Sequence, residues 1–317
     1  MKSSLTRSLP RLQKPSIWSV IWQNKTLLLM CLPAIAFFFV FSYMPMPGAY
    51  IAFTNFQYNK GIWASPFVGL QNFKFLFISG QLALLLRNTV LYNIAFIVVG
   101  NALQLTFAIL LNEVQSKIFK KTTQSMMFLP YFISDGLVTL LVYNLLNFDY
   151  GFISNLVRNL GGEMAKVYQM PGAWPYIIVL VNVWKGTGYG TVVYFAAITG
   201  MDASMMEAAQ IDGANGFQRI RYITLPTLKP TVVILFLFAI GGILKGNFGL
   251  FYNLVGANSM LFGTTDIIET YVYRSMMNSF NFSQSSAVGL FQSVVGFFIV
   301  IAANTIVKKL EPDYALF

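Results

Sequence analysis

Three ionisable side chains stand inside long apolar stretches of the sequence: Asp135, Lys185 and Lys245. A charge in the hydrocarbon of a bilayer is costly, so such side chains usually face a cavity or a partner and mark a transport path. We therefore expect these residues to line a path for a polar substrate. Two bases against one acid favour an anionic substrate, but lysine also hydrogen-bonds neutral hydroxyl groups.

Glycine-containing runs follow both lysines, KGTGYG at 185–190 and KGN at 245–247. Glycine lowers the stability of a helix. Broken helices near the midplane of a membrane commonly line a transport path, because their free backbone groups need water or substrate. We therefore expect both helices to break here, with Asn247, Trp184 and Tyr189 on the path and the two aromatic rings available to stack on a substrate.

Each charged residue also has a purely structural alternative. Asp135 and Lys185 could form an ion pair between neighbouring spans. Lys245 could lie near the outer interface, with its ammonium group reaching water along an apolar stem. The sequence leaves these alternatives open.

The sequence lacks the residues of a hydrolytic site. It contains no histidine and no evident pair of carboxylates for acid–base work. It also has no glycine-rich turn ending in Gly-Lys-Ser/Thr, which a P-loop needs to hold phosphates. We therefore expect no enzymatic activity, no metal site and no cofactor in this chain.

The composition is that of a membrane protein. Of 317 residues, 56% are apolar and 10% charged, and the mean hydropathy is +0.62, whereas a soluble domain carries about 25% charged residues. The net charge of +10 comes from short segments between apolar runs, which argues against nucleic-acid binding. A helical span needs about 20 apolar residues. We predict an all-α membrane protein with six spans, at 27–46, 88–111, 124–146, 173–199, 230–250 and 285–307.

Most lysines and arginines fall on one side of these spans, which predicts that side to be cytoplasmic. They lie in the amino-terminal segment 1–26, in the second-to-third and fourth-to-fifth connections, and after the sixth span. Both termini are therefore expected in the cytoplasm, with a permease domain over 27–317. The outer loops are expected at 51–87, 147–172 and 251–284.

The segment 202–226, followed by Pro230, has the features of a helix–turn–helix on the cytoplasmic side. Ser204 and Glu207 have the spacing of a capping box. Gly213 stands where a helix can end in a left-handed residue. Pro226 is expected to end the second helical piece, and Pro230 to begin the next span.

The same segment resembles the EAA motif of ABC importer permeases at every fixed position. The positions that carry the resemblance are Glu207, Ala208, Ala209, Gly213, Ile223, Leu225 and Pro226. The resemblance extends from about residue 85 to the carboxyl end. It is strongest to type I sugar permeases of the maltose-transporter kind, in the subgroup for complex oligosaccharides, which share phrases such as FLPYFIS at 128–134 and TYVYR at 270–274.

The resemblance implies a type I ABC importer permease fold with cytoplasmic coupling helices in the 202–226 segment. It also implies a second homologous permease, two ATPase subunits that carry ATP and magnesium, and an extracytoplasmic solute-binding protein. The protein would lie in the cytoplasmic membrane of a bacterium. Together with the two bases and one acid within the spans, the resemblance points to an acidic, uronate-containing oligosaccharide as substrate, whose rings could stack on Trp184 and Tyr189. Two alternatives remain: an ABC permease for a solute other than a sugar, and a secondary transporter driven by an ion gradient.

Overall fold

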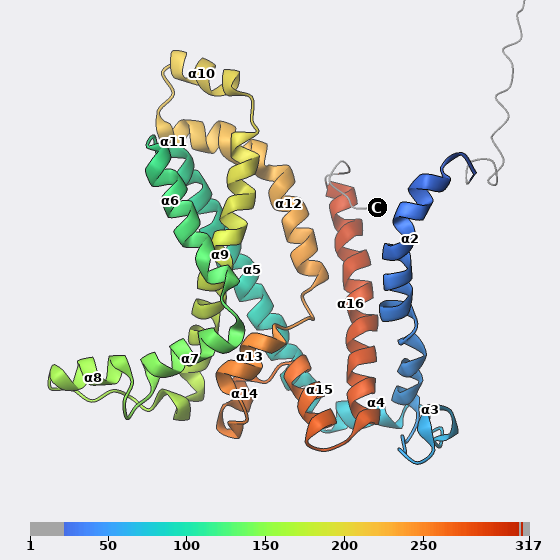
Figure 1. The fold of residues 1–317 in the computed structure, drawn as a ribbon. Coiled ribbons are helices and arrows are strands. Elements are labelled where there is room, and N and C mark those ends of the chain that lie inside the picture. The colour runs from blue at the N-terminus through green and yellow to red at the C-terminus, as the bar shows by residue number, and fades with distance from the viewer. Residues whose placement is uncertain (1–21, 311, 313–317) are drawn as a thin grey trace, which may run out of the picture. The chain divides into compact units, whose positions relative to one another are not determined.

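The computed structural model describes residues 22–310 and 312, and these are almost entirely helical (Figure 1). The chain divides into two units, Met1–Tyr50 and Ile51–Phe317. Most of the predicted cytoplasmic segment 1–26 and the end of the carboxyl-terminal tail lie outside the described residues. The β-structure of the described part is limited to one isolated bridge between Thr54 and Phe67.

The described part of the first unit contains one long apolar helical segment. It consists of α2 (Lys25–Phe38), the π-helical η1 (Phe39–Tyr43) and the start of η2 (Met46–Phe53). None of the residues of α2 is buried within the chain. This matches the predicted span 27–46, because an apolar helix of this length suits hydrocarbon as its solvent.

The second unit contains the remaining helices. Its first half comprises α3 (Gly61–Ala64), α4 (Gln71–Ile78), α5 (Gln81–Glu113), α6 (Lys117–Phe128), η3 (Leu129–Phe132), α7 (Asp135–Leu146), α8 (Phe152–Asn159), η4 (Val167–Gln169), η5 (Pro171–Ala173) and α9 (Trp174–Thr199). Its second half comprises α10 (Ala203–Ile211), α11 (Gly216–Arg219), η6 (Ile220–Thr224), α12 (Leu225–Gly241), α13 (Phe248–Val255), η7 (Ser259–Leu261), α14 (Phe262–Thr265), α15 (Ile268–Met277) and α16 (Phe282–Leu310).

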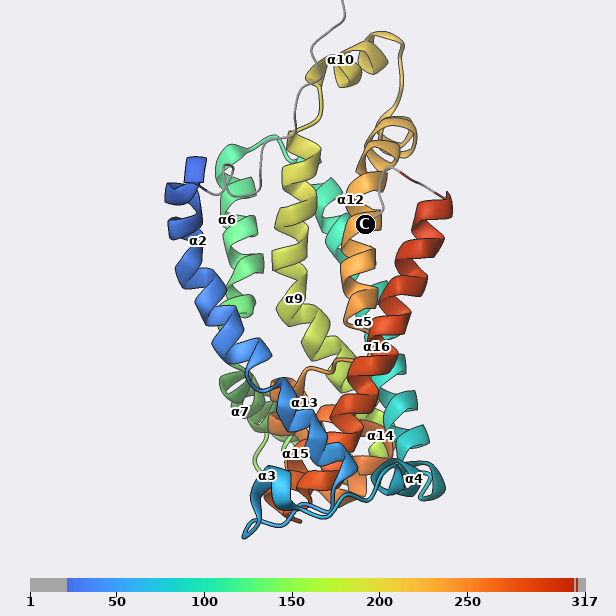
Figure 2. The same cartoon turned by 90° about the vertical axis from the view of Figure 1, so that its right-hand side faces the viewer.

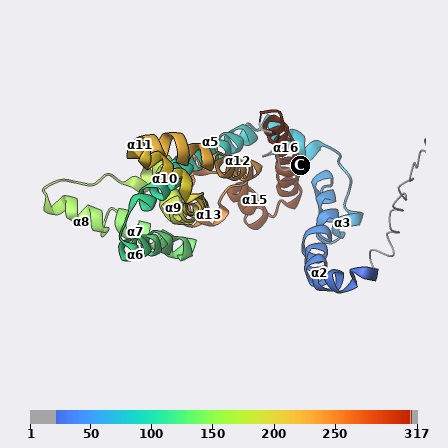
Figure 3. The ribbon, with the colours of Figure 1, turned by 90° about the horizontal axis from the view of Figure 1, so that it is seen from above.

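Helix α9 is the centre of the second unit. It contacts α5, α6 and α12, and α12 in turn contacts α16 (Figure 3). One end of the unit carries α10 and α11, with the start of α6 and the end of α16; we call this the α10 end. The opposite end, the α15 end, carries α4, α14 and α15 (Figures 1 and 2).

Four helices among the described residues are long and apolar enough to cross a membrane. They run over Lys25–Phe53, Gln81–Glu113, Gly216–Gly241 and Phe282–Lys309. A fifth span is obtained if the bent pair Lys117–Phe132 and Asp135–Leu146 is counted as one. Helix α9, at the predicted span 173–199, has 26 residues but is not in this apolar set, because Lys185 and several polar residues interrupt it.

The predicted third span, 124–146, is not one straight helix. The chain bends by 98° between η3 and α7. Pro130 stands in the first turn of η3, and Ser134 caps the new helix by accepting a hydrogen bond from the backbone N–H of Leu137 at 3.3 Å. Asp135 therefore begins a helix and does not lie in the middle of one.

The prediction that α9 breaks at 185–190 is wrong, because the helix runs unbroken through this segment. The glycines serve close packing. A methyl group on Gly188 would overlap the backbone carbonyl of Met127 on α6, and one on Gly190 would overlap the side chain of Gln104 on α5. Small residues commonly allow such close approach between membrane helices. Helix α9 is thus fitted tightly between its two neighbours.

Pro226 does not end a helix, and Pro230 does not begin one. Helices α11, η6 and α12 form one continuous helix over Gly216–Gly241, with Pro226 in the first turn of α12 and Pro230 inside it. The preceding turn, η6, is π-helical, and the N–H of Leu225 reaches back to the carbonyl of Ile220. Such wider turns help to re-satisfy the backbone near a proline in membrane helices.

Three apolar clusters hold the second unit together. The largest surrounds Trp174 and Phe251, where α5, α7, α9 and α13 meet. A second, around Leu85 and Ile268, joins α4, α5, α15 and α16. The third, around Tyr194 and Leu228, joins α5, α9 and α12. Outside these clusters many large apolar side chains are exposed on the helices, as expected where lipid is the solvent.

The α10 end is rich in basic residues. Lys117, Lys120 and Lys121 begin α6, Arg219 ends α11, and Lys308 and Lys309 lie in the last turn of α16. The sequence predicted these segments to share one side of the membrane, and in the second unit they do share one end. The amino-terminal basic residues of the same prediction, up to position 21, lie outside the described chain.

Candidate functional site

Asp135 and Lys185 form an ion pair between α7 and α9, so the structural alternative raised by the sequence is present. The side chains of Lys185 and Asp135 are only 18% and 25% exposed. The second carboxylate oxygen of Asp135 lies against Gly249 of α13, where a methyl group would overlap it. The pair therefore marks the meeting point of three helices.

An aromatic stack lies on the same helix as Lys185. The ring of Tyr189 is 5.0 Å from that of Tyr131 and inclined to it by 18°, and it is 6.2 Å from Phe128 at 21°. Tyr189 and Tyr131 are 50% and 45% exposed. The structure thus gives Tyr189 a partner that the sequence did not single out, within the phrase FLPYFIS. Trp184, by contrast, lines a separate apolar groove.

The predicted break near Lys245 is present, because α12 ends at Gly241 and α13 begins at Phe248. Asn247 caps α13 by accepting from the N–H of Leu250 at 3.1 Å. The side chain of Asn93 on α5 donates to the carbonyl of Lys245 at 3.1 Å. The break is therefore held in a defined shape.

Glu269 is the residue of this region that the sequence reasoning missed. Its Oε1 accepts from the N–H of Gly246 at 2.7 Å and from the amide of Gln292 on α16 at 2.8 Å. Its Oε2 is buried without a partner among the described residues. Glu269 lies in the predicted outer loop 251–284, so it was not among the charged residues of the predicted spans.

The same carboxylate borders a hollow of about 550 Å³ between the break, α15 and α16. Lys245, Gln292 and Ser293 supply its polar lining, together with Glu269. Lys245 is exposed and makes no ion pair with any described acid. The hollow thus combines the ammonium group of Lys245 and the carboxylate of Glu269 with amide and hydroxyl groups, all of which can hydrogen-bond a polar ligand.

Arg274 is not free for such a ligand. Its guanidinium group donates to both carboxylate oxygens of the buried Asp266, at 2.9 and 2.5 Å. It also stacks on Phe262, with 3.9 Å between the guanidinium carbon and the ring centre. This part of the phrase TYVYR therefore shapes the α15 end and leaves Lys245 as the available cation near the break.

The 202–226 segment forms the projecting tip of the α10 end (Figures 1 and 2). The capping box predicted for Ser204 and Glu207 is wrong. Asp202 caps α10, accepting from the N–H of Ser204 at 2.9 Å, and this backbone hydrogen bond lowers the pKa of the Asp202 carboxyl. A capping box occurs in the second arm, between Asn215 and Gln218.

The turn between the two arms is as predicted. Gly213 has a φ of +76°, and the next N–H, of Ala214, bonds back to the carbonyl of Ala209 at 2.9 Å. Glu207 and Ala208 are exposed on the first arm, and Glu207 has no ion-pair partner among the residues that the structure describes. Ile223 packs in the second arm, beside a hollow of about 370 Å³ that Ala209 and Gly213 also line.

Apolar side chains project from this tip into open space. Ile211 is 87% exposed and Phe217 is 69% exposed. Arg219 lies 4.0 Å from Glu113 at the end of α5, which ties the second arm to the helix bundle. The tip therefore presents a free acidic group, small residues and exposed apolar side chains, the composition of a surface that binds another protein.

Comparison with known proteins assigns the family of this chain. Residues 100–314 match the family described as "Binding-protein-dependent transport system inner membrane component". The chain is 34% identical to Protein LplB of Bacillus subtilis (strain 168) over 92% of this chain and 91% of the relative. It is 36% identical to the polygalacturonan/rhamnogalacturonan transport system permease protein YteP of the same organism, over 90% and 89%.

A solved structure has the same fold. A chain of a bacterial alginate ABC transporter, in complex with an alginate pentasaccharide-bound periplasmic protein, superposes with a TM-score of 0.83 at 31% identity. The match covers 93% of this chain and 98% of the other. The chain belongs to the family of inner membrane components of binding-protein-dependent transport systems and has the fold of an ABC importer permease.

Proposed function

We propose that this chain is the permease subunit of an ABC importer for an acidic, uronate-containing oligosaccharide. The relatives at more than 30% identity include a permease named for polygalacturonan and rhamnogalacturonan and one from an importer of the acidic polysaccharide alginate. The observation in this chain that carries the proposal is the exposed ammonium group of Lys245, which makes no ion pair with a described acid, on a hollow of about 550 Å³. It supplies positive charge where a uronate needs a partner.

The substrate path in this proposal runs past the break and the ion pair. Lys245 and Asn247 belong to the break. The pair of Asp135 and Lys185 lies beside Gly249, two residues after Asn247. Tyr189 offers half of its surface for contact with a sugar ring. A uronate carboxylate that approaches Lys185 competes with Asp135 for the same ammonium group, so passage of substrate would weaken the α7–α9 contact.

The α10 end faces the cytoplasm in this proposal, as its basic residues indicate. The 202–226 segment then contacts an ATPase subunit, through Glu207, Ala208, Ala209 and Gly213 of the first arm and Ile223, Leu225 and Pro226 of the second. ATP and magnesium belong to two ATPase subunits, and this chain holds no cofactor. A second, homologous permease and an extracytoplasmic solute-binding protein complete the importer, which lies in the cytoplasmic membrane.

Replacement of Glu207 by Lys tests the coupling role. The free carboxylate of Glu207 would lose its basic partner on the ATPase, so ATP hydrolysis should no longer support uptake, or the complex should not assemble. Glu163→Lys, in the exposed 147–172 connection, introduces the same charge change at the other end. Coupled uptake at the wild-type rate by the Glu207 variant would refute the assignment.

The substrate charge is tested by uptake into proteoliposomes that contain the whole importer. We expect oligogalacturonate to be taken up and neutral oligosaccharides of the same length to compete poorly. Lys245→Gln should reduce oligogalacturonate uptake by about tenfold or more, since a charged hydrogen bond contributes roughly 1.5–3 kcal/mol. Lys60→Gln, an exposed lysine elsewhere, is the matched control. Equal transport of charged and neutral sugars by the wild type would contradict an acidic substrate.

A further inference from the structure

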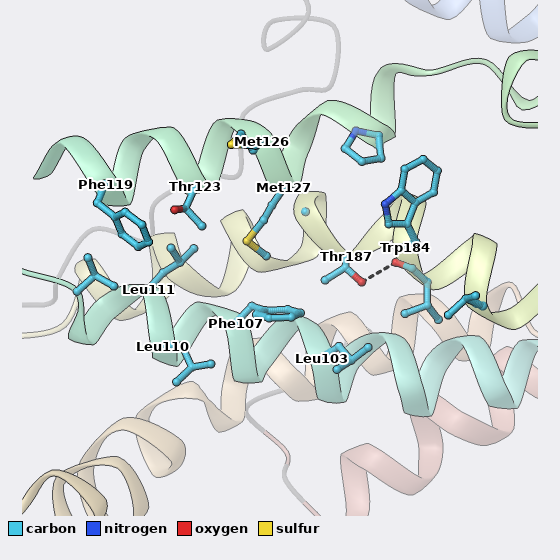
Figure 4. A pocket seen from close by; sticks show the side chains of 15 residues that line it. Leu103, Phe107, Leu110, Leu111, Phe119, Thr123, Met126, Met127, Trp184 and Thr187 are labelled. Atoms are coloured by element: carbon cyan, nitrogen blue, oxygen red, sulfur yellow. Dashed lines mark hydrogen bonds between the residues drawn. The ribbon is translucent and has the colours of Figure 1, made fainter. Parts of the chain in front are cut away.

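An apolar groove of about 700 Å³ runs between α5, α6 and α9. Figure 4 shows Phe119 and Trp184 at opposite ends of it, with Phe107 and Met127 between them. The hydroxyl of Thr187 in its wall donates to the carbonyl of Val183 at 2.5 Å, so this donor needs no hydrogen-bond acceptor on a ligand. The groove therefore suits a hydrocarbon chain.

The length of the groove matches one leaflet of a bilayer. On α6 and η3 its lining runs from Phe119 to Pro130, which at roughly 1.5 Å per residue is about 16 Å. The hydrocarbon core is about 30 Å thick, so the groove spans about half of it. A transmembrane helix from a partner subunit would be about twice as long as the groove, whereas an acyl chain has the right length.

Three lysines stand at the end of the groove where Phe119 lies. Lys117, Lys120 and Lys121 occupy the first turns of α6, and none of them forms an ion pair with a described acid. The ammonium group of Lys120 is 5.4 Å from the ring centre of Phe195 on α9, so it bridges two of the helices that form the groove. Basic side chains beside a gap between membrane helices bind anionic lipid headgroups on the cytoplasmic side.

We propose that this groove is a binding site for an anionic phospholipid of the leaflet at the α10 end. One acyl chain lies in the groove, and the headgroup phosphate lies at Lys120 beside α9, with Lys117 and Lys121 adding positive charge around the first turns of α6. The lipid thereby bridges α6 to α5 and α9, and so supports the helices that precede the bend at 98°. The site goes beyond the transport of a saccharide and requires no contact with it.

The test uses the fluorescence of Trp184, which is 43% exposed in the groove. The complete importer is placed in nanodiscs of phosphatidylcholine, and phosphatidylglycerol with brominated acyl chains is titrated in. The Trp184 signal is the difference between the wild type and Trp184→Phe. We expect this signal to be quenched at a few mole per cent of brominated phosphatidylglycerol, and at much higher fractions of brominated phosphatidylcholine.

Two triple variants separate the headgroup site from bulk charge. K117Q/K120Q/K121Q should weaken the binding of brominated phosphatidylglycerol, measured by quenching of Trp184, by roughly 100-fold. Each basic residue near an anionic lipid contributes about fivefold to its affinity. K60Q/K74Q/K166Q removes the same charge from the exposed residues of the outer connections and should leave the titration unchanged. Leu110→Phe, at an exposed residue of the groove wall, should narrow the groove, hinder entry of the chain and reduce quenching of Trp184.

Two results would overturn the proposal. Equal quenching by both brominated lipids would mean ordinary contact with surrounding lipid. Absence of quenching by either would mean that another subunit covers the groove. A nanodisc offers the same lipid to both faces of the protein, so these results do not depend on the orientation or on the substrate proposed above.

Discussion

The carboxylate of Glu269 in α15 accepts the backbone N–H of Gly246 at 2.7 Å, and so fixes the non-helical stretch between α12 and α13. The same oxygen accepts from Gln292 of α16 at 2.8 Å. Three segments that are separate in the sequence thus converge on one oxygen atom. The other oxygen remains buried without a partner in the described part of the chain. The contacts of Glu269 therefore all go through one oxygen, and its role is to position the break.

Replacement of Glu269 by Ala should therefore disturb the break more than the loss of side-chain volume alone would. It removes the acceptor of two hydrogen bonds, each worth about 1.5–3 kcal/mol when the acceptor is charged. We expect a lower melting temperature of the purified importer and a large loss of uptake. Glu269→Gln keeps an acceptor oxygen for Gly246 and should retain more of both. Glu163→Ala, at an exposed site, is the control, and equal effects at the two sites would contradict the positioning role.

The ion pair of Asp135 and Lys185 gives a prediction that separates structure from transport. Asp135→Asn or Lys185→Met alone leaves a partly buried charge without its partner and should destabilise the protein by roughly 3 kcal/mol. The double variant removes both charges and should recover most of that loss. If Lys185 also meets the substrate, uptake of an acidic saccharide should stay low in the stable double variant. Restored uptake would assign the pair a structural role alone.

The glycines of α9 allow a matched pair of substitutions within one helix. A methyl group on Gly188 overlaps the carbonyl of Met127, whereas nothing lies within 4 Å of the same group on Gly186. Gly188→Ala should cost about 1–3 kcal/mol through overpacking, while Gly186→Ala should be neutral or stabilise the helix by up to about 1 kcal/mol. Thermal melting of the purified protein measures both. Similar effects would argue against close packing of α9 on α6.

Sequence patterns predicted the helical membrane fold, because apolar length and basic connections report directly on the bilayer. They failed where one residue type can have either of two structural effects, as glycine does in a helix. The run 185–190 contains glycines that could break α9, but Gly188 and Gly190 instead permit contact with Met127 and Gln104. Only the positions of the neighbouring helices distinguish these cases.

The candidate site was predicted in part for a related reason. Asp135 and Lys185 were found because charges stand out in apolar runs, and the structure joins them. Glu269 was not found, because it stands in a polar connection and its importance comes from Gly246, 23 residues away in the sequence. Tyr131 could not be distinguished in the sequence from many other aromatic residues. Only the fold shows that its ring stacks on that of Tyr189.

Ile211 at the tip of α10 provides the last prediction. This side chain is 87% exposed in a segment that carries Glu207, and exposure of a large apolar residue beside a free acid is typical of a surface that another protein covers. Ile211→Ala should weaken association with the ATPase subunits about tenfold or more, because burial of such a side chain contributes roughly 1.5–3 kcal/mol. Ile118→Ala, 82% exposed at the start of α6, removes the same side chain from the α10 end outside the tip. Co-purification of the ATPase subunits with each variant decides the matter: if both variants retain them equally, Ile211 is not part of the contact.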